Sequence, residues 1–203
     1  MKGYLQSISK GCCRQTLCLL VCMALSACKS SATNEPTRIE VVKGGYFRLI
    51  APEQMDTPAY VMQVVNGEYR GRSYQFMAQI EIDRNRLTFV ASSPLGIPLF
   101  TTFFADNDIS SDVSSIIEGA ISPANMLADY QLAYCSAQLL HSRLSDTQLS
   151  VREVSGGRDI YWQDRNIIQI RYQAEPSWQG KVIYRHLEWD YTITSETISM
   201  EDS

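Results

Sequence analysis

The stretch Ser73-Tyr74-Gln75-Phe76-Met77-Ala78-Gln79-Ile80-Glu81-Ile82-Asp83 decides the fold class of this chain. Its side chains alternate: Tyr74, Phe76, Ala78, Ile80 and Ile82 share one face, and Gln75, Gln79 and Glu81 share the other. A period of two is that of a β-strand with one buried face. The polar turn 83–86 follows, in which Asn85 can take a left-handed backbone, and the chain returns as a strand over 87–92. This pattern predicts an antiparallel hairpin.

Short strand-like runs continue to the end of the chain. They are predicted over 148–154, 159–163, 167–172, 181–185 and 191–197, with turns at Ser155-Gly156-Gly157 and Asp164-Arg165-Asn166. Short turns join antiparallel neighbours, because parallel strands need long crossovers. The fold class we predict is mostly β, a curved antiparallel half-barrel with a small helical lid.

The lid is predicted from a segment near the middle of the chain. Ser122-Pro123 resembles a helix N-cap followed by proline at the first helical position. Apolar residues then recur every three or four positions, at Met126, Tyr130, Ala133, Ala137, Leu140 and Leu144. That spacing is helical. Ser136 can cap a second helix and 112–119 can form a helical turn, so we place the lid at about 112–145, within a single domain over 38–203.

The N-terminal segment has the order of a secretory signal. A basic stretch precedes nine apolar residues, Leu17 to Leu25, which are too few to span a membrane. Leu25-Ser26-Ala27-Cys28 resembles the bacterial lipobox, whose cysteine becomes the acylated first residue of the mature protein. We therefore expect a signal peptide over 1–27 and a lipidated Cys28 with a flexible tether over 28–37. The alternative is a soluble exported protein that is cleaved nearby.

The residue after the cysteine indicates the destination of such lipoproteins. Aspartate there resembles an inner-membrane retention signal, and this chain has Lys29. The resemblance implies lipid anchoring in the outer membrane, on its periplasmic face.

Charge and cysteine content exclude several classes of function. Residues 1–27 contain three of the 18 basic residues and none of the 22 acidic ones, so 15 bases and 22 acids remain, a net charge of −7. An acidic chain without a basic cluster argues against nucleic-acid binding. The expected mature chain retains Cys135 as its one unmodified cysteine, so no internal disulfide can form.

We expect no catalytic site, metal or cofactor. The sequence contains no G-x-S-x-G, H-E-x-x-H, P-loop or G-x-G-x-x-G motif. His141 and His186 do not lie at ligand spacing from another His, Cys or carboxylate.

Aromatic residues on the predicted strands and lid are the remaining candidates for a site. A bent sheet lined by such side chains can enclose a lipid-sized cavity, and the same residues can equally form a filled core. The candidate cavity-lining residues are Tyr74, Phe76, Phe89, Phe100, Phe103, Tyr130 and Tyr134.

A resemblance favours the cavity. The stretch 86–96 (RLTFVASSPLG), a strand that ends in Pro94-Leu95-Gly96, resembles the outer-membrane lipoprotein receptor LolB. In that family the loop leucine protrudes and helps to pass acyl chains into the bilayer. The resemblance implies a LolA/LolB-like fold and gives Leu95 that role, whereas an ordinary hairpin tip would also explain the loop.

Two stretches resemble a narrower family. Residues 94–100 (PLGIPLF) and 127–134 (LADYQLAY) are similar to an uncharacterised lipoprotein family, often encoded beside aryl-polyene and fatty-acid-type synthesis genes. Cys135-Ser136 departs from the Trp-Pro that relatives tend to show at that position.

The expected function is therefore non-enzymatic. We expect an outer-membrane lipoprotein that binds a lipid, an acyl or polyene-lipid ligand, or lipoprotein acyl chains in an apolar half-barrel, for transfer to the membrane. Transport or biosynthesis proteins are further expected partners. Two alternatives remain: an assembly or scaffold lipoprotein that binds a protein partner, and a thioesterase-like enzyme acting on lipid intermediates.

Overall fold

The computed structural model describes residues 37–117, 122–144, 147–175 and 177–201, all within one compact unit, Glu35–Ser203. The expected signal peptide, Cys28 and residues 28–36 of the tether lie outside the described residues.

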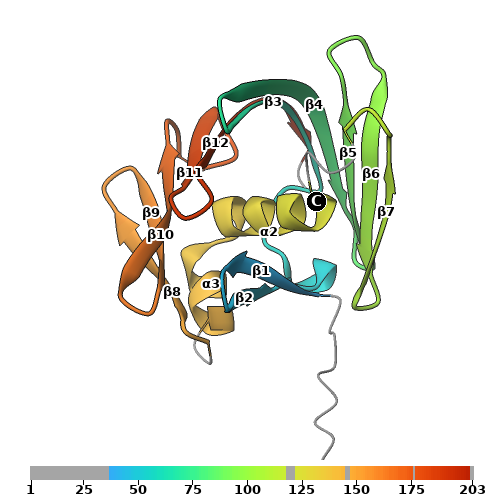
Figure 1. Ribbon diagram of the computed structural model, residues 1–203. Coiled ribbons are helices and arrows are strands. Elements are labelled where there is room, and N and C mark those ends of the chain that lie inside the picture. Colours follow the sequence, from blue (N-terminus) through green and yellow to red (C-terminus); the bar gives the residue numbers. More distant parts are fainter. Residues whose placement is uncertain (1–36, 118–121, 145–146, 176, 202–203) are drawn as a thin grey trace, which may run out of the picture. The chain divides into compact units, whose positions relative to one another are not determined.

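A ten-stranded antiparallel sheet forms most of this unit. It curves into an open arch (Figure 1), with the strand order β7-β6-β5-β4-β3-β12-β11-β10-β9-β8. The strands are β3 (Tyr60–Tyr69), β4 (Arg72–Ile82), β5 (Arg86–Ser92), β6 (Pro98–Ala105), β7 (Asp108–Val113), β8 (Leu149–Val154), β9 (Gly157–Trp162), β10 (Arg165–Tyr172), β11 (Lys181–His186) and β12 (Tyr191–Glu201). The predicted mostly β class and antiparallel pairing are confirmed.

Two local predictions were wrong. Asn85 does not adopt a positive φ; instead the Asp83 carboxylate accepts hydrogen bonds from the backbone N–H of Asn85 and of Arg86, which closes the turn. Of the turn predicted over 112–119, Asp112 and Val113 belong instead to strand β7, which pairs with β6. The N–H of Ile117 bonds to the carbonyl of Ser114 in a single turn, and 118–119 lie outside the described residues.

The two predicted helices are present. Helix α2 (Pro123–Tyr134) begins at Ser122, whose Oγ accepts a hydrogen bond from the backbone N–H of Asn125. Helix α3 (Ala137–Leu144) follows after Ser136, whose Oγ accepts from the N–H of Leu139. Among the described residues the helices lie within 123–144, against the predicted 112–145, of which 118–121 and 145 lie outside the described residues.

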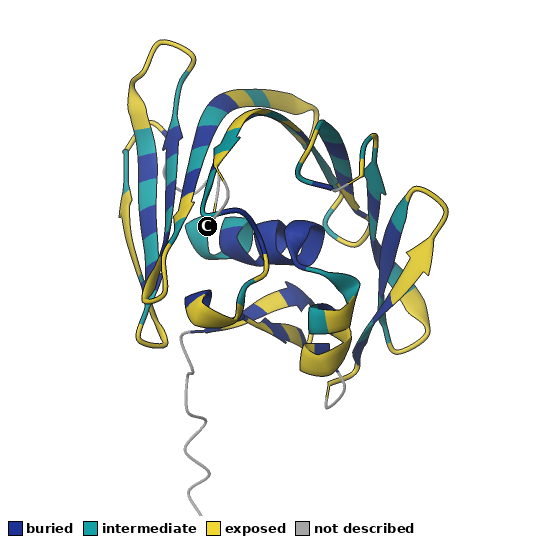
Figure 2. Ribbon diagram, turned by 180° about the vertical axis from the view of Figure 1, so that it is seen from behind, coloured by how far each residue is buried: buried dark blue, intermediate teal, exposed yellow. Residues whose placement is uncertain are grey.

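Helix α2 lies inside the arch, which differs from the predicted lid. Its residues Leu127–Tyr134 are all buried, and Figure 2 shows the helix dark blue over most of its length. The hairpin of β1 (Arg38–Val42) and β2 (Gly45–Arg48) covers the side of α2 away from the arch (Figure 1). The 3-10 helix η1 (Pro52–Gln54) then leads toward β3. A helix that is buried all round over its last two turns is a core element, and its buried polar residues, Asp129 and Gln131, each have hydrogen-bond partners.

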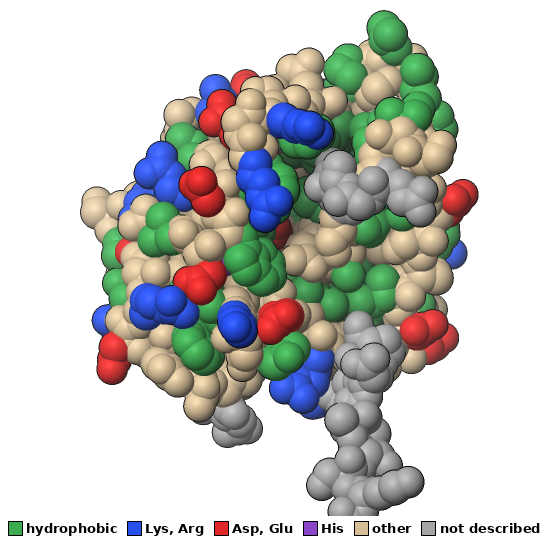
Figure 3. All heavy atoms as spheres, in the orientation of Figure 1, with side chains coloured by type: hydrophobic (Ala, Val, Ile, Leu, Met, Phe, Trp, Pro, Cys, Tyr) green, Lys and Arg blue, Asp and Glu red, His purple; other side chains and the backbone are tan. Residues whose placement is uncertain are grey.

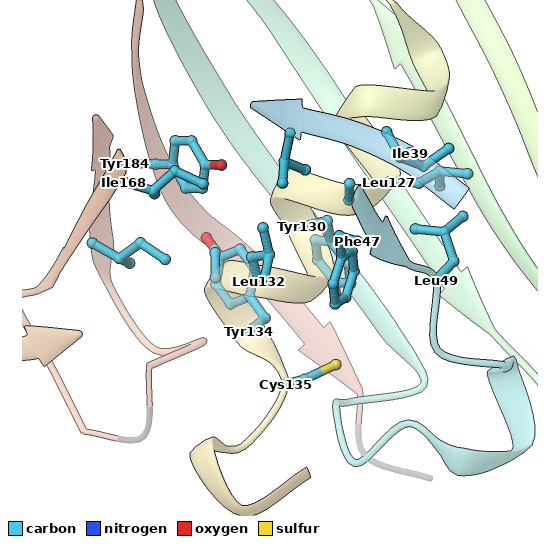
Figure 4. Close-up of a cluster of buried hydrophobic side chains, with 14 of the residues drawn as sticks. Ile39, Phe47, Leu49, Leu127, Tyr130, Leu132, Tyr134, Cys135, Ile168 and Tyr184 are labelled. Atoms are coloured by element: carbon cyan, nitrogen blue, oxygen red, sulfur yellow. The ribbon is translucent and has the colours of Figure 1, made fainter. Parts of the chain in front are cut away.

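The core therefore has two layers, one on each side of α2. Figure 4 shows Ile39, Phe47 and Leu49 near the helix from the N-terminal segment, and Ile168 and Tyr184 from the sheet. A buried Arg158 from β9 donates a hydrogen bond to the carbonyl of Cys135, 2.6 Å away, at the C-terminal end of α2. A cation at that position complements the negative end of the helix dipole.

Candidate functional site

An apolar pocket opens between the sheet and the first turns of α2. Its volume is about 300 Å³, at the lower end of the usual range for ligand sites. The wall residues are Val65, Gly67, Glu68, Tyr69, Tyr74, Phe76, Ser122, Asn125, Met126, Asp129, Trp189, Tyr191, Thr192 and Ile193. A smaller space of about 30 Å³ shares several of these walls and extends deeper between helix and sheet.

Gly67 explains why the pocket stays open. It lies two residues after the buried Val65 on the concave face of β3, opposite Tyr74 of β4. A Cβ at Gly67 would be 4.0 Å from the Cβ of Tyr74, so a side chain there would meet free space. Glycine normally weakens a strand interior, and it often marks a site that a ligand approaches.

Asp129 of α2 is the charged residue deepest in this pocket wall. Its side chain is buried, at 7% exposed. The hydroxyl of Tyr184 donates to one carboxylate oxygen at 2.6 Å, and that of Tyr191 donates to the other at 2.7 Å. Burial raises the pKa of Asp129 from 3.8 to about 6, although both hydrogen bonds lower it. A buried carboxyl with a shifted pKa beside a pocket is a typical feature of a functional site.

His186 supports the wall behind Tyr191. Its ring stacks on Trp189 at 4.6 Å and lies 4.9 Å from the ring of Tyr191. The backbone N–H of Trp189 donates to Nδ1, so Nε2 carries the proton and donates to the carbonyl of Val41. Burial lowers the pKa of His186 to about 4. The imidazole is therefore neutral and holds two pocket aromatics in place.

Six of the seven predicted cavity-lining residues lie on the concave side, although only two reach the main pocket. Tyr74 and Phe76 line the pocket, and Phe89, Tyr130 and Tyr134 line its small extension. Phe100 packs against Phe89 and Phe76, with ring centroids 5.6 and 6.4 Å apart. These contacts show that much of the interior is filled core.

Phe103 is the exception among the predicted residues. On β6 the buried positions are Phe100, Thr102 and Phe104, so Phe103 lies on the convex face, where the guanidinium of Arg86 covers its ring. Strand alternation brings the adjacent Phe104 inward instead.

The predicted Pro94-Leu95-Gly96 loop joins β5 to β6 and projects from one end of the sheet (Figure 1). Leu95 is 88% exposed, and the Ser93 hydroxyl accepts hydrogen bonds from the N–H groups of Leu95 and Ile97. Ile97 and Ile116 are also exposed. The backbone N–H of Ser114 donates to the carbonyl of Leu99, which holds the segment before Ile116 at the same end of the sheet. Figure 3 shows hydrophobic side chains clustered at this projecting corner, which comprises the β5–β6 loop and the segment after β7.

The strand register places this corner and the pocket at the same end of the sheet. Ser92 pairs with Met77, so the loop after Ser92 continues along β4 toward Arg72. Tyr74, Gly67 and Tyr69, which line the pocket, lie at that end of β3 and β4. Tyr191 pairs with Tyr69, which brings the start of β12 there as well.

Asp129, Tyr184 and Tyr191 were not predicted as site residues. Asp129 lies three residues after Met126 and four before Ala133, so it interrupts the apolar stripe of the helix. A carboxylate at such a position signals a buried, partnered charge. Its two partners lie 55 and 62 residues away in sequence, and no local pattern connects them.

The described residues offer little for covalent or metal chemistry. Burial raises the pKa of the Cys135 thiol to about 12, so it stays protonated. Within the described ranges there is no group of three or more His, Cys, Asp or Glu side chains able to hold a metal ion. In the same ranges, no helix combines the length and apolar character needed to cross a membrane.

The fold and site define a class of open, curved antiparallel β domain with a central helix and an apolar pocket at one end. A family model described as "Protein of unknown function (DUF3261)" matches residues 60–199, from β3 into β12, which is well over half of the chain. The chain belongs to this family. The comparison with curated proteins found no match.

Proposed function

We propose that this protein is a lipid-anchored carrier that binds one acyl or polyene chain in the pocket and exchanges it with the membrane. The observation that carries the proposal is the position of the pocket, at the same end of the sheet as the exposed Leu95. A chain leaving the pocket at this end meets a surface of Leu95, Ile97 and Ile116, which is suited to contact with lipid.

The size of the pocket limits the ligand. A volume of about 300 Å³ holds about ten groups of the size of a water molecule, at about 30 Å³ each. One medium-length chain fits this space, whereas the three chains of a lipoprotein exceed it. Among the ligands expected from the sequence, the pocket therefore favours a single acyl or polyene chain.

The proposed anchor is the acylated Cys28, and the proposed location is the periplasmic face of the outer membrane. The support is the lipobox-like Leu25-Ser26-Ala27-Cys28 and the following Lys29. The intact mass of the mature protein extracted from outer membranes tests the anchor. A mass equal to that of the unmodified chain from residue 28 would exclude it.

Filling the pocket should weaken ligand binding. We expect Gly67→Ile to weaken binding of the neutral fluorescent dye N-phenyl-1-naphthylamine by about tenfold to a hundredfold, because the new side chain takes the space of several buried methylene groups. A fluorescence titration of the purified protein measures this effect.

Thr101→Ile is the matched control. Thr101 is a half-buried residue on the convex side of β6, so the same side chain enters a strand without reaching the pocket. Its dye affinity should equal that of the wild type. Equal affinities in all three proteins would show that the dye binds elsewhere. The absence of dye binding by the wild type would refute the proposal that this pocket binds an apolar ligand.

A second candidate function is assembly with a protein partner. The exposed side chains of Leu95, Ile97 and Ile116, together with the largely filled interior, favour it. Crosslinking in intact cells from Leu95→Cys distinguishes the two functions. One stoichiometric protein adduct supports assembly, whereas copurified lipid without such an adduct supports the carrier.

A further inference from the structure

The pocket carries negative charge without a matching base. Its wall includes the buried carboxylate of Asp129. Glu68 also borders the pocket, but it alternates with the concave Gly67 and Tyr69, so its exposed carboxylate lies on the convex side of β3. None of the described residues in the wall is a lysine, arginine or histidine. Arg70, in the β3–β4 turn, and Arg72, at the start of β4, lie beyond the mouth, and the guanidinium of Arg70 stacks on the Tyr69 ring at 4.9 Å.

The apolar part of the wall is rich in aromatic rings. Tyr69, Tyr74, Phe76, Trp189 and Tyr191 all contribute to it. The free faces of such rings attract cations, tryptophan most strongly, and the attraction grows when the cation is desolvated. His186 covers one face of Trp189, and the Arg70 guanidinium already lies over Tyr69. Aromatic faces combined with a carboxylate are therefore suited to an organic cation.

The hydrogen-bonding groups around Asp129 lead to the same conclusion. Both tyrosine hydroxyls donate hydrogen bonds to the carboxylate, so neither Tyr184 nor Tyr191 can donate another hydrogen bond to a ligand. A carboxylate has about four lone-pair sites, and the tyrosines occupy only two. The deepest polar group of the pocket is thus an acceptor with spare capacity, which can take a hydrogen bond from a donor on the ligand and offers none to an acceptor.

We propose that the pocket selects an apolar chain whose polar end is a cation or a hydrogen-bond donor, such as an alkyl- or aryl-amine, and discriminates against free carboxylic acids. This inference rests on the proposed function, because it assumes that a single chain occupies the pocket. It narrows the ligand class: the carboxylate of a free fatty acid would lie against Asp129 without a neutralising base.

The ionisation of the pocket agrees with this selectivity. The groups that face Asp129 are Tyr184 of β11 and Tyr191 of β12, with Tyr74 of β4 farther out along the wall. The carboxylate of Glu68 lies on the convex side of β3. Burial raises the pKa of Tyr184 and of Tyr191 well above its usual value, so both remain donors. His186 behind Tyr191 is neutral because burial lowers its pKa to about 4. Amine binding should therefore strengthen as Asp129 loses its proton above a pH of about 6.

Three amphiphiles of equal chain length test the inference. Decylamine, decan-1-ol and decanoate, each below its micelle concentration, would compete with N-phenyl-1-naphthylamine for the purified protein near neutral pH. We expect decylamine to bind about tenfold or more tightly than decanoate, with decan-1-ol between them. Asp129→Asn should remove most of this preference, whereas Glu68→Gln, on the convex side of β3, should reduce it only slightly.

The outcomes separate this inference from the proposed function. If decanoate binds as tightly as decylamine, or if Asp129→Asn keeps the preference, the inference is overturned and the carrier function stands. If the wild type binds none of the three amphiphiles, both fail. A pH series on the wild type gives an independent reading, because an affinity for decylamine that does not rise between about pH 5 and about pH 7 also overturns the inference.

Discussion

Replacing Asp129 with asparagine should stabilise the protein at neutral pH and leave its stability almost unchanged near pH 4. The carboxyl group releases its proton near 3.8 in an ordinary environment and near 6 in the folded protein, where burial disfavours the charge. The stability that the neutral carboxyl contributes is fully present below a pH of 3.8 and is lost as the pH rises through about 6. This difference corresponds to about 3 kcal/mol, and asparagine avoids the loss.

His186 has the opposite dependence on pH. Burial lowers its pKa from 6.5 to about 4, so its contribution is present above 6.5 and is lost as the pH falls through about 4. Between about pH 4 and about pH 6 the two groups offset each other, by about 3 kcal/mol each. The wild type should therefore show a flat stability profile there, and Asp129→Asn should show a profile that falls steadily toward acid.

Denaturant unfolding at a series of pH values from about 4 to about 8 measures both profiles. Asp164→Asn provides the control, because the Asp164 side chain is fully exposed and its contact with Arg152 spans 3.7 Å at the surface. Its effect should stay within about 0.5 kcal/mol at every pH. A difference between Asp129→Asn and the wild type that does not vary with pH would contradict the assignment.

The expected gain on removing Asp129 has a functional meaning. A buried charge that lowers the stability of the folded protein at neutral pH persists where it serves a purpose, because stability and function often oppose each other at sites. Asp129 borders a pocket whose other walls are mostly apolar or aromatic. Recognition of a cationic or donor group by this carboxylate accounts for the unfavourable energy.

Local sequence patterns predicted the parts of the fold that local physics determines. The alternation over 73–83 and the spacing over 122–144 each reflect one buried face of one element, and both elements form as predicted. Phe103 and Phe104 show where such reasoning fails. Two adjacent phenylalanines fit either face of a strand, and the choice depends on the register of β6 against β5.

Long-range contacts account for the rest. The predicted lid lies inside the arch because the hairpin over 38–48 covers its outer side. The pocket combines β3, β4, β12 and α2, and the partners of Asp129 follow it in the sequence by 55 and 62 residues. Aromatic residues on the strands therefore indicated the concave face, whereas the open part of that face depends on Gly67, which lacks a side chain.

The side chain of Gln131 shows how the helix is held in that position, and its removal should have a large effect. Gln131 is fully buried on α2; its Oε1 accepts from the backbone N–H of Ile50 at 2.7 Å, and its Nε2 donates to the carbonyl of Ile50 at 2.8 Å. We expect Gln131→Leu to lower the free energy of unfolding by about 2–5 kcal/mol, because two buried backbone groups lose their partners. Denaturant unfolding measures the loss.

Gln138→Leu separates this effect from helix propensity. Gln138 is an exposed residue on α3, so the same substitution there should change stability by no more than about 0.5 kcal/mol. Leucine is also a good helix former of similar size. A loss at Gln131 therefore reports the missing hydrogen bonds, and equal stabilities for the two variants would contradict this role.

The loss of stability in Gln131→Leu should affect the N-terminal hairpin more than the sheet. Ile50 lies just after β2, where the chain leaves the N-terminal hairpin, so the Gln131 amide joins that hairpin to the central helix across 81 residues of sequence. Without it, the amides of β1 and β2 should exchange with solvent faster than those of β3 and β4, which the sheet still holds. Hydrogen exchange that accelerates equally in both regions would show instead that the hairpin and the sheet open as one cooperative unit.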